Sequence, residues 1–254
     1  GVHKEAKEIW NQKLNNIVVE GGKKEDRIKF YTGLYHALLG RGLSNDVNGD
    51  FPEIDGKIGK TPLDENGRPK YNHYNTDGIW GGFWNLSQVW ALAYPDYFSD
   101  YVQTGVDFYK DRGWLHDGAA AGVFTNGVQT NFQGLLLASA YNVGIRDFDL
   151  KTGYEAALKN ELEYHGRNLG NGKYDLAYFV KEHYIPYKDT TISNGWVFNF
   201  GASHTLEYSF SSYAVAQMAK GMNDTSSYNK LMQQAEYYNN LFDPETKFIR
   251  PKLE

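Results

Sequence analysis

Three carboxylates have the sequence surroundings in which acid–base chemistry occurs. Asp77 and Asp117 lie beside aromatic residues, and Glu207 lies in the first turns of a strongly apolar helical segment. An ionised carboxylate on an enclosed helix is costly unless a positive or hydrogen-bonding group meets it, so Glu207 stands out. Two carboxyl groups can hydrolyse a glycosidic bond, one protonating the leaving oxygen and the other acting as base or nucleophile. The alternative for Glu207 is a side chain that reaches solvent past the helix end.

Motifs of other common chemistries are absent from the sequence. It has no P-loop, no G-x-G-x-x-G after a strand, no H-E-x-x-H and no G-x-S-x-G. The seven His residues do not pair at metal-ligand spacing, which argues against zinc, and His36 is predicted to be a satisfied core histidine. The segment from Asp46 starts like a calcium loop, but Phe51 and Lys57 stand where an EF-hand needs Gly and Glu.

The composition narrows the class of protein. A net charge of −5 with scattered lysines argues against nucleic acid, and no apolar run is long enough to span a membrane. The absence of cysteine excludes disulfides, thiolate metal sites and cysteine nucleophiles. Aromatic residues make up 16% of the chain, which suits stacking against sugar rings but is also consumed by a large helical core.

Helical spacing of apolar residues recurs along most of the chain. It predicts helices over residues 4–19, 25–39, 84–94, 98–110, 131–143, 151–165, 202–222 and 226–241. Residues 40–77 and 113–130 read as loops, and 166–201 is a mixed stretch with a possible strand near 196–200. The helix 202–222 is small or apolar on nearly every side, with one face of mostly large residues, so we expect other helices to enclose it; that face carries Leu206, Phe210, Tyr213, Ala214 and Met218.

Helices that are apolar on two sides alternate with helices that carry one polar face. Residues 27–39, 84–94, 131–143 and 204–220 belong to the first kind. This alternation predicts an all-α toroid, in which inner helices ring a central funnel and the loops at one rim hold the chemistry.

Several segments together resemble the catalytic domain of glycoside hydrolase family 92. They are F-Y-T-G-L-Y-H-A-L-L (30–39), S-N-D-V-N-G-D-F (44–51), A-Y-N-V-G-I-R-D-F-D (140–149), T-L-E-Y (205–208), A-V-A-Q-M-A-K (214–220) and Y-Y-N-N-L-F-D-P-E-T-K-F-I-R-P-K (237–252). The resemblance follows the family's order over most of the chain.

This family comprises calcium-dependent, inverting exo-α-mannosidases, largely bacterial and exported, whose (α/α)6 toroid follows a β-sandwich. The resemblance therefore implies one incomplete toroid-like catalytic-domain fragment over residues 1–254, without the sandwich. It implies an α-1,2-mannosidase type of activity on a mannose-containing oligosaccharide or glycan, and a periplasmic or secreted location. A surface left bare by the missing sandwich would favour self-association and modest stability.

The resemblance also implies a site and shows where this chain departs from the family. The family's W-D-T-x-R is W-G-G-F-W here, so Gly81 replaces an acidic residue and Trp84 an arginine. Phe124 occupies the position of the catalytic acid, and Ser211 and Ser212 that of an acidic pair. The family's base is expected at or beyond the end of this chain.

On this basis the expected catalytic residues are Glu207 and Asp77, with Glu207 also near one calcium ion. The expected substrate contacts are Trp80, Trp84, His204, Asp46, Phe124 and Asn126.

Loss of a general acid from a glycosidase lowers its rate by about 10²–10⁴. Three interpretations remain open: a divergent glycosidase, for example one that acts on a sugar phosphate whose leaving group needs no protonation; a glycan-binding relative without activity; and a helical scaffold whose aromatics are core.

Overall fold

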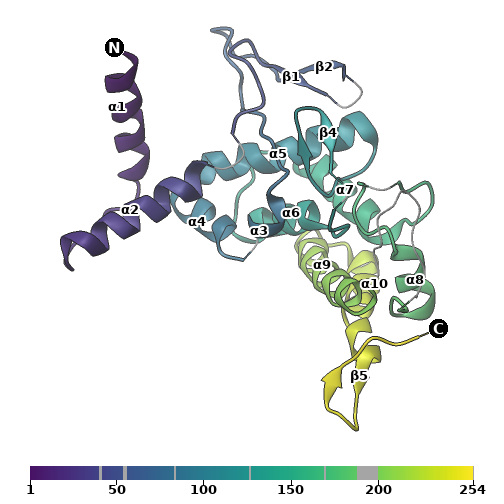
Figure 1. The fold of residues 1–254 in the computed structure, drawn as a ribbon. Helices are drawn as coiled ribbons and strands as arrows, with labels where there is room; N and C mark the ends of the chain where they lie inside the picture. The colour runs from purple at the N-terminus through teal and green to yellow at the C-terminus, as the bar shows by residue number, and fades with distance from the viewer. Residues whose placement is uncertain are drawn as a thin grey trace.

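The chain is mostly helical, as the apolar spacing predicts (Figure 1). The structure is a computed structural model that describes residues 1–39, 42–53, 56–82, 84–125, 127–168, 170–187 and 200–253. Its helices are α1 Val2–Leu14, α2 Lys24–Leu39, α3 Ile79–Gly82, α4 Leu86–Ala93, α5 Pro95–Arg112, α6 Phe132–Asn142, α7 Leu150–Leu162, α8 Leu176–Glu182, α9 Gly201–Gly221, α10 Thr225–Ala235 and the 3-10 helix η2 Tyr237–Leu241. Among the described helices, none has both the length and the apolar character that crossing a bilayer requires.

Local chemistry explains many of the helix ends. Helix α5 begins at Pro95, where the ring's fixed φ suits a first helical turn, and ends at Arg112, just before Gly113, whose φ of 72° is left-handed. The side chains of Asn131, Asp149 and Asp224 accept hydrogen bonds from backbone N–H groups in the first turns of α6, α7 and α10. Such capping satisfies donors that a helix start would otherwise leave unpaired.

The described part of the chain also contains three antiparallel hairpins. They pair β1 Asp50–Pro52 with β2 Ile58–Lys60, β3 Ala119–Ala120 with β4 Val123–Phe124, and β5 Phe242–Asp243 with β6 Phe248–Ile249. The predicted loop 40–77 therefore contains a hairpin, and a bridge between Leu43 and Tyr74 ties its two ends together. The possible strand near 196–200 lies almost wholly outside the described residues.

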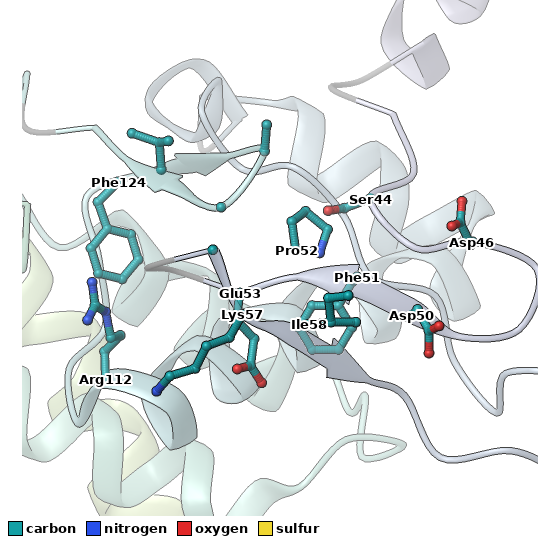
Figure 2. A pocket seen from close by; sticks show the side chains of 14 residues that line it. Ser44, Asp46, Asp50, Phe51, Pro52, Glu53, Lys57, Ile58, Arg112 and Phe124 are labelled. Atoms are coloured by element: carbon teal, nitrogen blue, oxygen red, sulfur yellow. The ribbon is translucent and has the colours of Figure 1, made fainter.

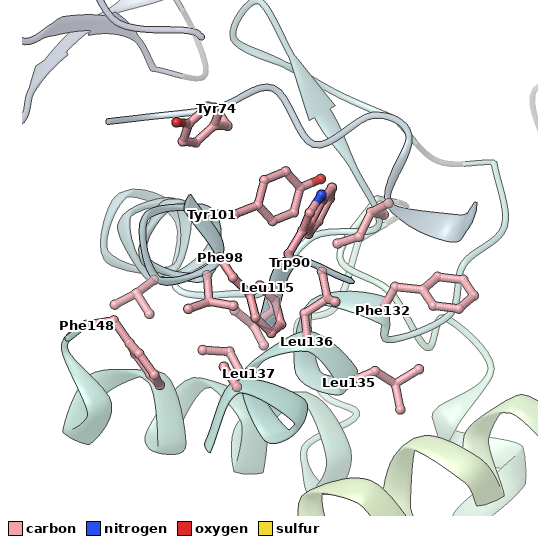
Figure 3. Close-up of a cluster of buried hydrophobic side chains, with 14 of the residues drawn as sticks. Tyr74, Trp90, Phe98, Tyr101, Leu115, Phe132, Leu135, Leu136, Leu137 and Phe148 are labelled. Atoms are coloured by element: carbon pink, nitrogen blue, oxygen red, sulfur yellow. The ribbon is translucent and has the colours of Figure 1, made fainter. Parts of the chain in front are cut away.

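The main core forms where α4, α5 and α6 meet (Figure 3). Trp90 of α4, Phe98 of α5 and Leu136 of α6 are buried there, together with Leu115 from the loop after α5. Helix α6 is buried on nearly every side, as the sequence predicts. Helix α5 carries more buried side chains than a helix with one polar face is expected to have.

The prediction that helix α9 is enclosed on nearly every side is wrong, because one of its faces is exposed. Leu206, Phe210 and Tyr213 are 40%, 46% and 49% exposed, whereas Met218 on the same face is fully buried. The buried face instead carries small residues, among them Ser209, Ser211, Ser212, Ala216 and Ala219. Small side chains let the backbone of α9 approach α6, α7 and α10 closely, and that closeness decides the buried face.

Helices α1 and α2 project from the other helices at the N-terminal end (Figure 1). Helix α1 has no buried residue, and α2 has only Leu34. The prediction that α2 is enclosed on two sides is wrong, and so is the prediction of a core histidine, because His36 is exposed. Trp10 meets Tyr35 edge to face at 4.5 Å, which holds the two helices together.

A buried ion pair joins the second half of the chain. The side chains of Lys173 and Glu161 are fully buried and in contact, and Lys173 Nζ also donates to the Tyr208 carbonyl (3.3 Å) and Ser212 Oγ (3.4 Å). Glu161 accepts further bonds from Asn131 Nδ2 and Ser212 Oγ, both 2.6 Å. Burial lowers the pKa of Lys173 to about 8, although the charge of Glu161 opposes this shift. The pair thus links the start of α6, the end of α7 and the middle of α9.

Replacing Lys173 by Met should leave the Glu161 carboxylate buried without its cation. We expect the free energy of unfolding in urea to fall by about 3–5 kcal/mol. The double variant Glu161→Gln with Lys173→Met should regain part of this loss, because no buried charge remains. A single-variant loss below about 1 kcal/mol, typical of an exposed pair, would contradict the assignment.

Exposed apolar side chains on α2 and α9 lead us to expect self-association. The double variant Phe210→Ser with Tyr213→Ser should lower the mass measured by light scattering after size-exclusion chromatography. The matched change Thr32→Ser on α2 should leave that mass unchanged. A wild-type chain that stays monomeric at every concentration would refute this expectation.

Candidate functional site

A cavity of about 850 Å³ lies between the β1–β2 and β3–β4 hairpins (Figure 2). Its walls combine apolar and charged side chains, the mixture that suits a sugar with its C–H faces and hydroxyl rim. The lining side chains are Ser44, Asp46, Asp50, Phe51, Pro52, Glu53, Lys57, Ile58, Arg112, Ala121, Val123 and Phe124.

Two glycines permit the close packing at this cavity, Gly122 between the two hairpins and Gly59 within the first hairpin. A Cβ on Gly122 would lie 2.6 Å from the Glu53 carbonyl oxygen, and a Cβ on Gly59 would lie 2.5 Å from the Phe51 ring. Gly122 also has a φ of 71°, a conformation that side chains disfavour. The backbone of Glu53 therefore lies directly against the turn that leads to Phe124.

Neutral histidines support the two aromatic walls. Phe124 stacks on His116 with ring centroids 5.1 Å apart, and Phe51 stacks on His73 at 3.9 Å. Burial lowers the pKa of both His73 and His116 to about 3, so both rings are neutral at ordinary pH. His116 Nε2 is also hydrogen-bonded to Thr76 Oγ1 at 2.8 Å. These contacts fix the rings, and neither His carries charge into the cavity.

Charges in the cavity are separated along its length. Asp46 and Asp50 lie at one end in Figure 2, and Lys57, Arg112 and Phe124 lie at the other. Asp50 accepts a charge-assisted bond from Lys60 at 2.9 Å, which lowers the pKa of Asp50. The Arg112 guanidinium lies 5.5 Å from the centre of the Phe124 ring.

Asp117 organises the turn before α6. Its buried carboxylate accepts hydrogen bonds from the backbone N–H of Val128 (2.9 Å), Gln129 (2.7 Å) and Thr130 (3.3 Å), and from Trp80 Nε1 (3.4 Å). Burial raises the pKa of Asp117, and these donors act in the opposite direction. A carboxylate engaged by four donors is a structural anchor, so the interpretation of Asp117 as a catalytic group is not supported.

His204 and Glu207 of α9 lie next to this turn. The His204 ring is engaged at both nitrogens, by Asp175 Oδ2 at 2.9 Å and the Val128 carbonyl at 3.0 Å. Glu207 is half-buried; burial raises its pKa and the charge of His204 opposes this. Glu207 Oε2 is buried without a hydrogen-bond partner among the described residues. One oxygen of Glu207 is thus available to a cation or a donor.

The described residues contain no group of three or more His, Cys, Asp or Glu side chains that could hold a metal ion. A calcium ion at Glu207 would therefore need neutral oxygen ligands, such as backbone carbonyls, amides and water, for most of its coordination shell. The orphaned Glu207 oxygen fits one position of such a shell.

The structure brings the predicted site residues into two neighbouring groups. Asp46 and Phe124 line the cavity, whereas Trp80 and His204 both contact the Asp117 turn. Asp77 also lies near this turn, since a Cβ on Gly118 would come within 3.3 Å of its Cα. The two groups are neighbours in the chain, because the β3–β4 hairpin that carries Phe124 follows Asp117 directly.

Two predicted residues do not join these groups. Trp84 is 75% exposed and lines no part of the cavity, so the structure gives no support for its role as a substrate contact. The other, Asn126, lies outside the described residues.

Sequence reasoning overlooked the cavity-facing side chains of the first hairpin, Asp50, Glu53 and Lys57. The segment 40–77 reads as ordinary polar loop, so its carboxylates are attributed to turn chemistry. An available signal is the Asp55-Gly56 dipeptide, a combination typical of tight hairpin turns.

Comparison with known proteins identifies the family. All of the chain, residues 1–254, matches the family model of the glycosyl hydrolase family 92 catalytic domain. The chain therefore belongs to glycosyl hydrolase family 92. This agrees with the resemblance carried by the sequence segments.

Three relatives show how much of a family member the chain spans. Over 99% of its own length, the chain is 24% identical to an uncharacterized secreted glycosidase of Arthroderma benhamiae. This alignment covers only 28% of the fungal protein. The chain superposes with a TM-score of 0.84 on a family 92 α-mannosidase of Bacteroides thetaiotaomicron in complex with mannoimidazole, with 22% identity over 99% of this chain and 30% of that one. A family 92 inverting mannosidase of the same bacterium gives a TM-score of 0.84 and 24% identity, over 98% of this chain and 32% of that one. These matches confirm the predicted helical, toroid-type fold, since family 92 catalytic domains have an (α/α)6 barrel.

Proposed function

We propose that this chain is part of a glycoside hydrolase that cleaves mannose from mannose-containing oligosaccharides or glycans. The observation that carries this proposal is the superposition of nearly the whole chain on two mannosidases of the same family. The chain spans about a third or less of these proteins, so the proposal concerns the whole protein of which such a domain is a part.

The cavity supports a carbohydrate ligand on independent grounds. Phe51 and Phe124 offer aromatic faces for sugar C–H groups, and Asp46, Asp50 and Glu53 offer acceptors for hydroxyl groups. An inverting hydrolase needs two carboxyl groups about 6.5–9.5 Å apart, with water between one of them and the sugar. We propose inversion and an exo-acting, α-1,2-mannosidase type of specificity, supported by the family and by the inverting relative.

We further propose a secreted or periplasmic location, supported by the secreted fungal relative. The second candidate function is glycan binding without cleavage. It is favoured by Phe124, which occupies the family's acid position by resemblance and cannot donate a proton.

Incubation with α-1,2-mannobiose and yeast mannan should release free mannose, measured by anion-exchange chromatography. Proton NMR of the first turnovers should show β-mannose before mutarotation, because inversion of an α-linkage gives the β-anomer. Binding of these glycans without release would favour the second candidate. Neither binding nor release would leave a helical scaffold as the better interpretation.

We also propose that one calcium ion binds at Glu207, which would supply one carboxylate oxygen while neutral oxygens and water complete the shell. When bound, the ion would attract sugar hydroxyl oxygens to this side of the site. The buried, unpartnered Glu207 Oε2 supports this placement.

Calcium should raise the melting temperature of the wild-type chain relative to a chelator, because a ligand that binds only the folded state stabilises it. Glu207→Gln should abolish the shift. The matched control Glu25→Gln, an exposed glutamate on α2, should keep it. An equal melting temperature of the wild type with calcium and with chelator would rule out the site.

A further inference from the structure

We propose that a second cavity, which lies among helices α2 to α6, binds a single-ring aromatic molecule that carries one hydroxyl group, of the size of phenol. The volume of this cavity is about 180 Å³, and no described residue lines both it and the cavity between the hairpins. None of the residues assigned above to the glycosidase lines it either. The proposal is therefore independent of that function.

Aromatic side chains of the core form one wall of this second cavity. Trp90 of α4 lies with its ring centroid 4.9 Å from that of Tyr97 and 5.1 Å from that of Tyr101, both on α5. Trp90 Nε1 also donates to the Ala37 carbonyl of α2 at 3.4 Å. Trp90, Tyr101 and Leu136 of α6 lie close together at this edge of the core (Figure 3). The wall is thus built by core packing before any ligand arrives.

Gly82, at the end of α3, faces open space in this cavity. The residue is buried, yet a Cβ there would meet no heavy atom within 4 Å, its neighbours in the chain aside. Protein interiors are close-packed, so a buried position with nothing in front of it marks a void. By contrast, a Cβ on Gly59 would lie 2.5 Å from the Phe51 ring. The φ of Gly82 is not left-handed, so a larger residue can adopt its backbone conformation.

The size of the cavity selects a single ring. An apolar cavity of about 150 Å³ is large enough to bind benzene. At about 180 Å³, this cavity has room for one six-membered ring with a small substituent. The faces and edges of Trp90, Tyr97 and Tyr101 can contact such a ring in the edge-to-face arrangement that aromatic pairs prefer.

The remaining walls argue against a sugar or water as the occupant. Ile79, Leu86 and Leu136 offer no hydrogen bond, so a sugar would lose the hydration of its hydroxyl rim there without compensation. A buried water needs two to four polar partners. The Tyr97 hydroxyl makes no hydrogen bond to a described residue, and burial raises its pKa. A ring with one hydroxyl group could pair with it and bury the rest of its surface against apolar groups.

The test uses 4-fluorophenol as the probe and follows its binding to the whole chain by fluorine NMR. The wild type should bind the probe saturably. Gly82→Leu should raise the dissociation constant at least about tenfold, because the new side chain occupies the space of the ring. Its melting temperature should equal or exceed that of the wild type, since the change fills a void.

A second filling variant and a matched control locate the bound ring. Ala37→Leu fills the cavity from α2 and should weaken binding as Gly82→Leu does. Gly81→Leu changes the exposed neighbour on α3, where a Cβ also meets open space, and should leave the dissociation constant unchanged. Methyl α-mannoside should not displace the probe.

Three results would overturn the proposal. They are no saturable binding of 4-fluorophenol, binding that either filling variant retains, and displacement of the probe by methyl α-mannoside. The last result would make the cavity a sugar site. None of the three bears on mannose release, which is measured separately.

Discussion

The buried contact between Lys173 and Glu161 is the constraint on which the second half of the molecule depends. A carboxylate and an ammonium group removed from water must satisfy each other and their remaining hydrogen-bonding capacity. They do so through Asn131, Ser212 and the Tyr208 carbonyl, which belong to different segments. These segments can therefore pack together in only one register, that is, in one relative position. In that position the turn before α6 lies against α9.

The site follows from this register. The start of α6 carries the turn that Asp117 anchors, and the same turn is held to α9 by His204 through the Val128 carbonyl. Residues 118–125 return from Asp117 as the β3–β4 hairpin, which forms one wall of the cavity. A structural ion pair thus fixes a cavity that it does not touch, because backbone hydrogen bonds transmit the placement.

The helices and their limits could largely be predicted from sequence, and the buried faces could be predicted less well. Helix α6 is apolar all round, so any packing buries it. Helix α9 offers two choices, a face of large apolar residues or a face of small ones, and close backbone approach selected the small one. Helix α2 shows the same limit, since its spacing predicts a buried face for which the described chain offers few partners.

The sequence by itself determined the family, the helix periods and the caps, because these depend on residue type and local spacing. Tertiary structure alone decided which loop carboxylates share a cavity, which Asp is an anchor and which cation neutralises Glu161. Those pairings join residues that are far apart in the chain, such as Asp117 with Trp80 and Glu53 with Gly122. Local propensity carries no information about such distances, since packing of whole helices and hairpins sets them.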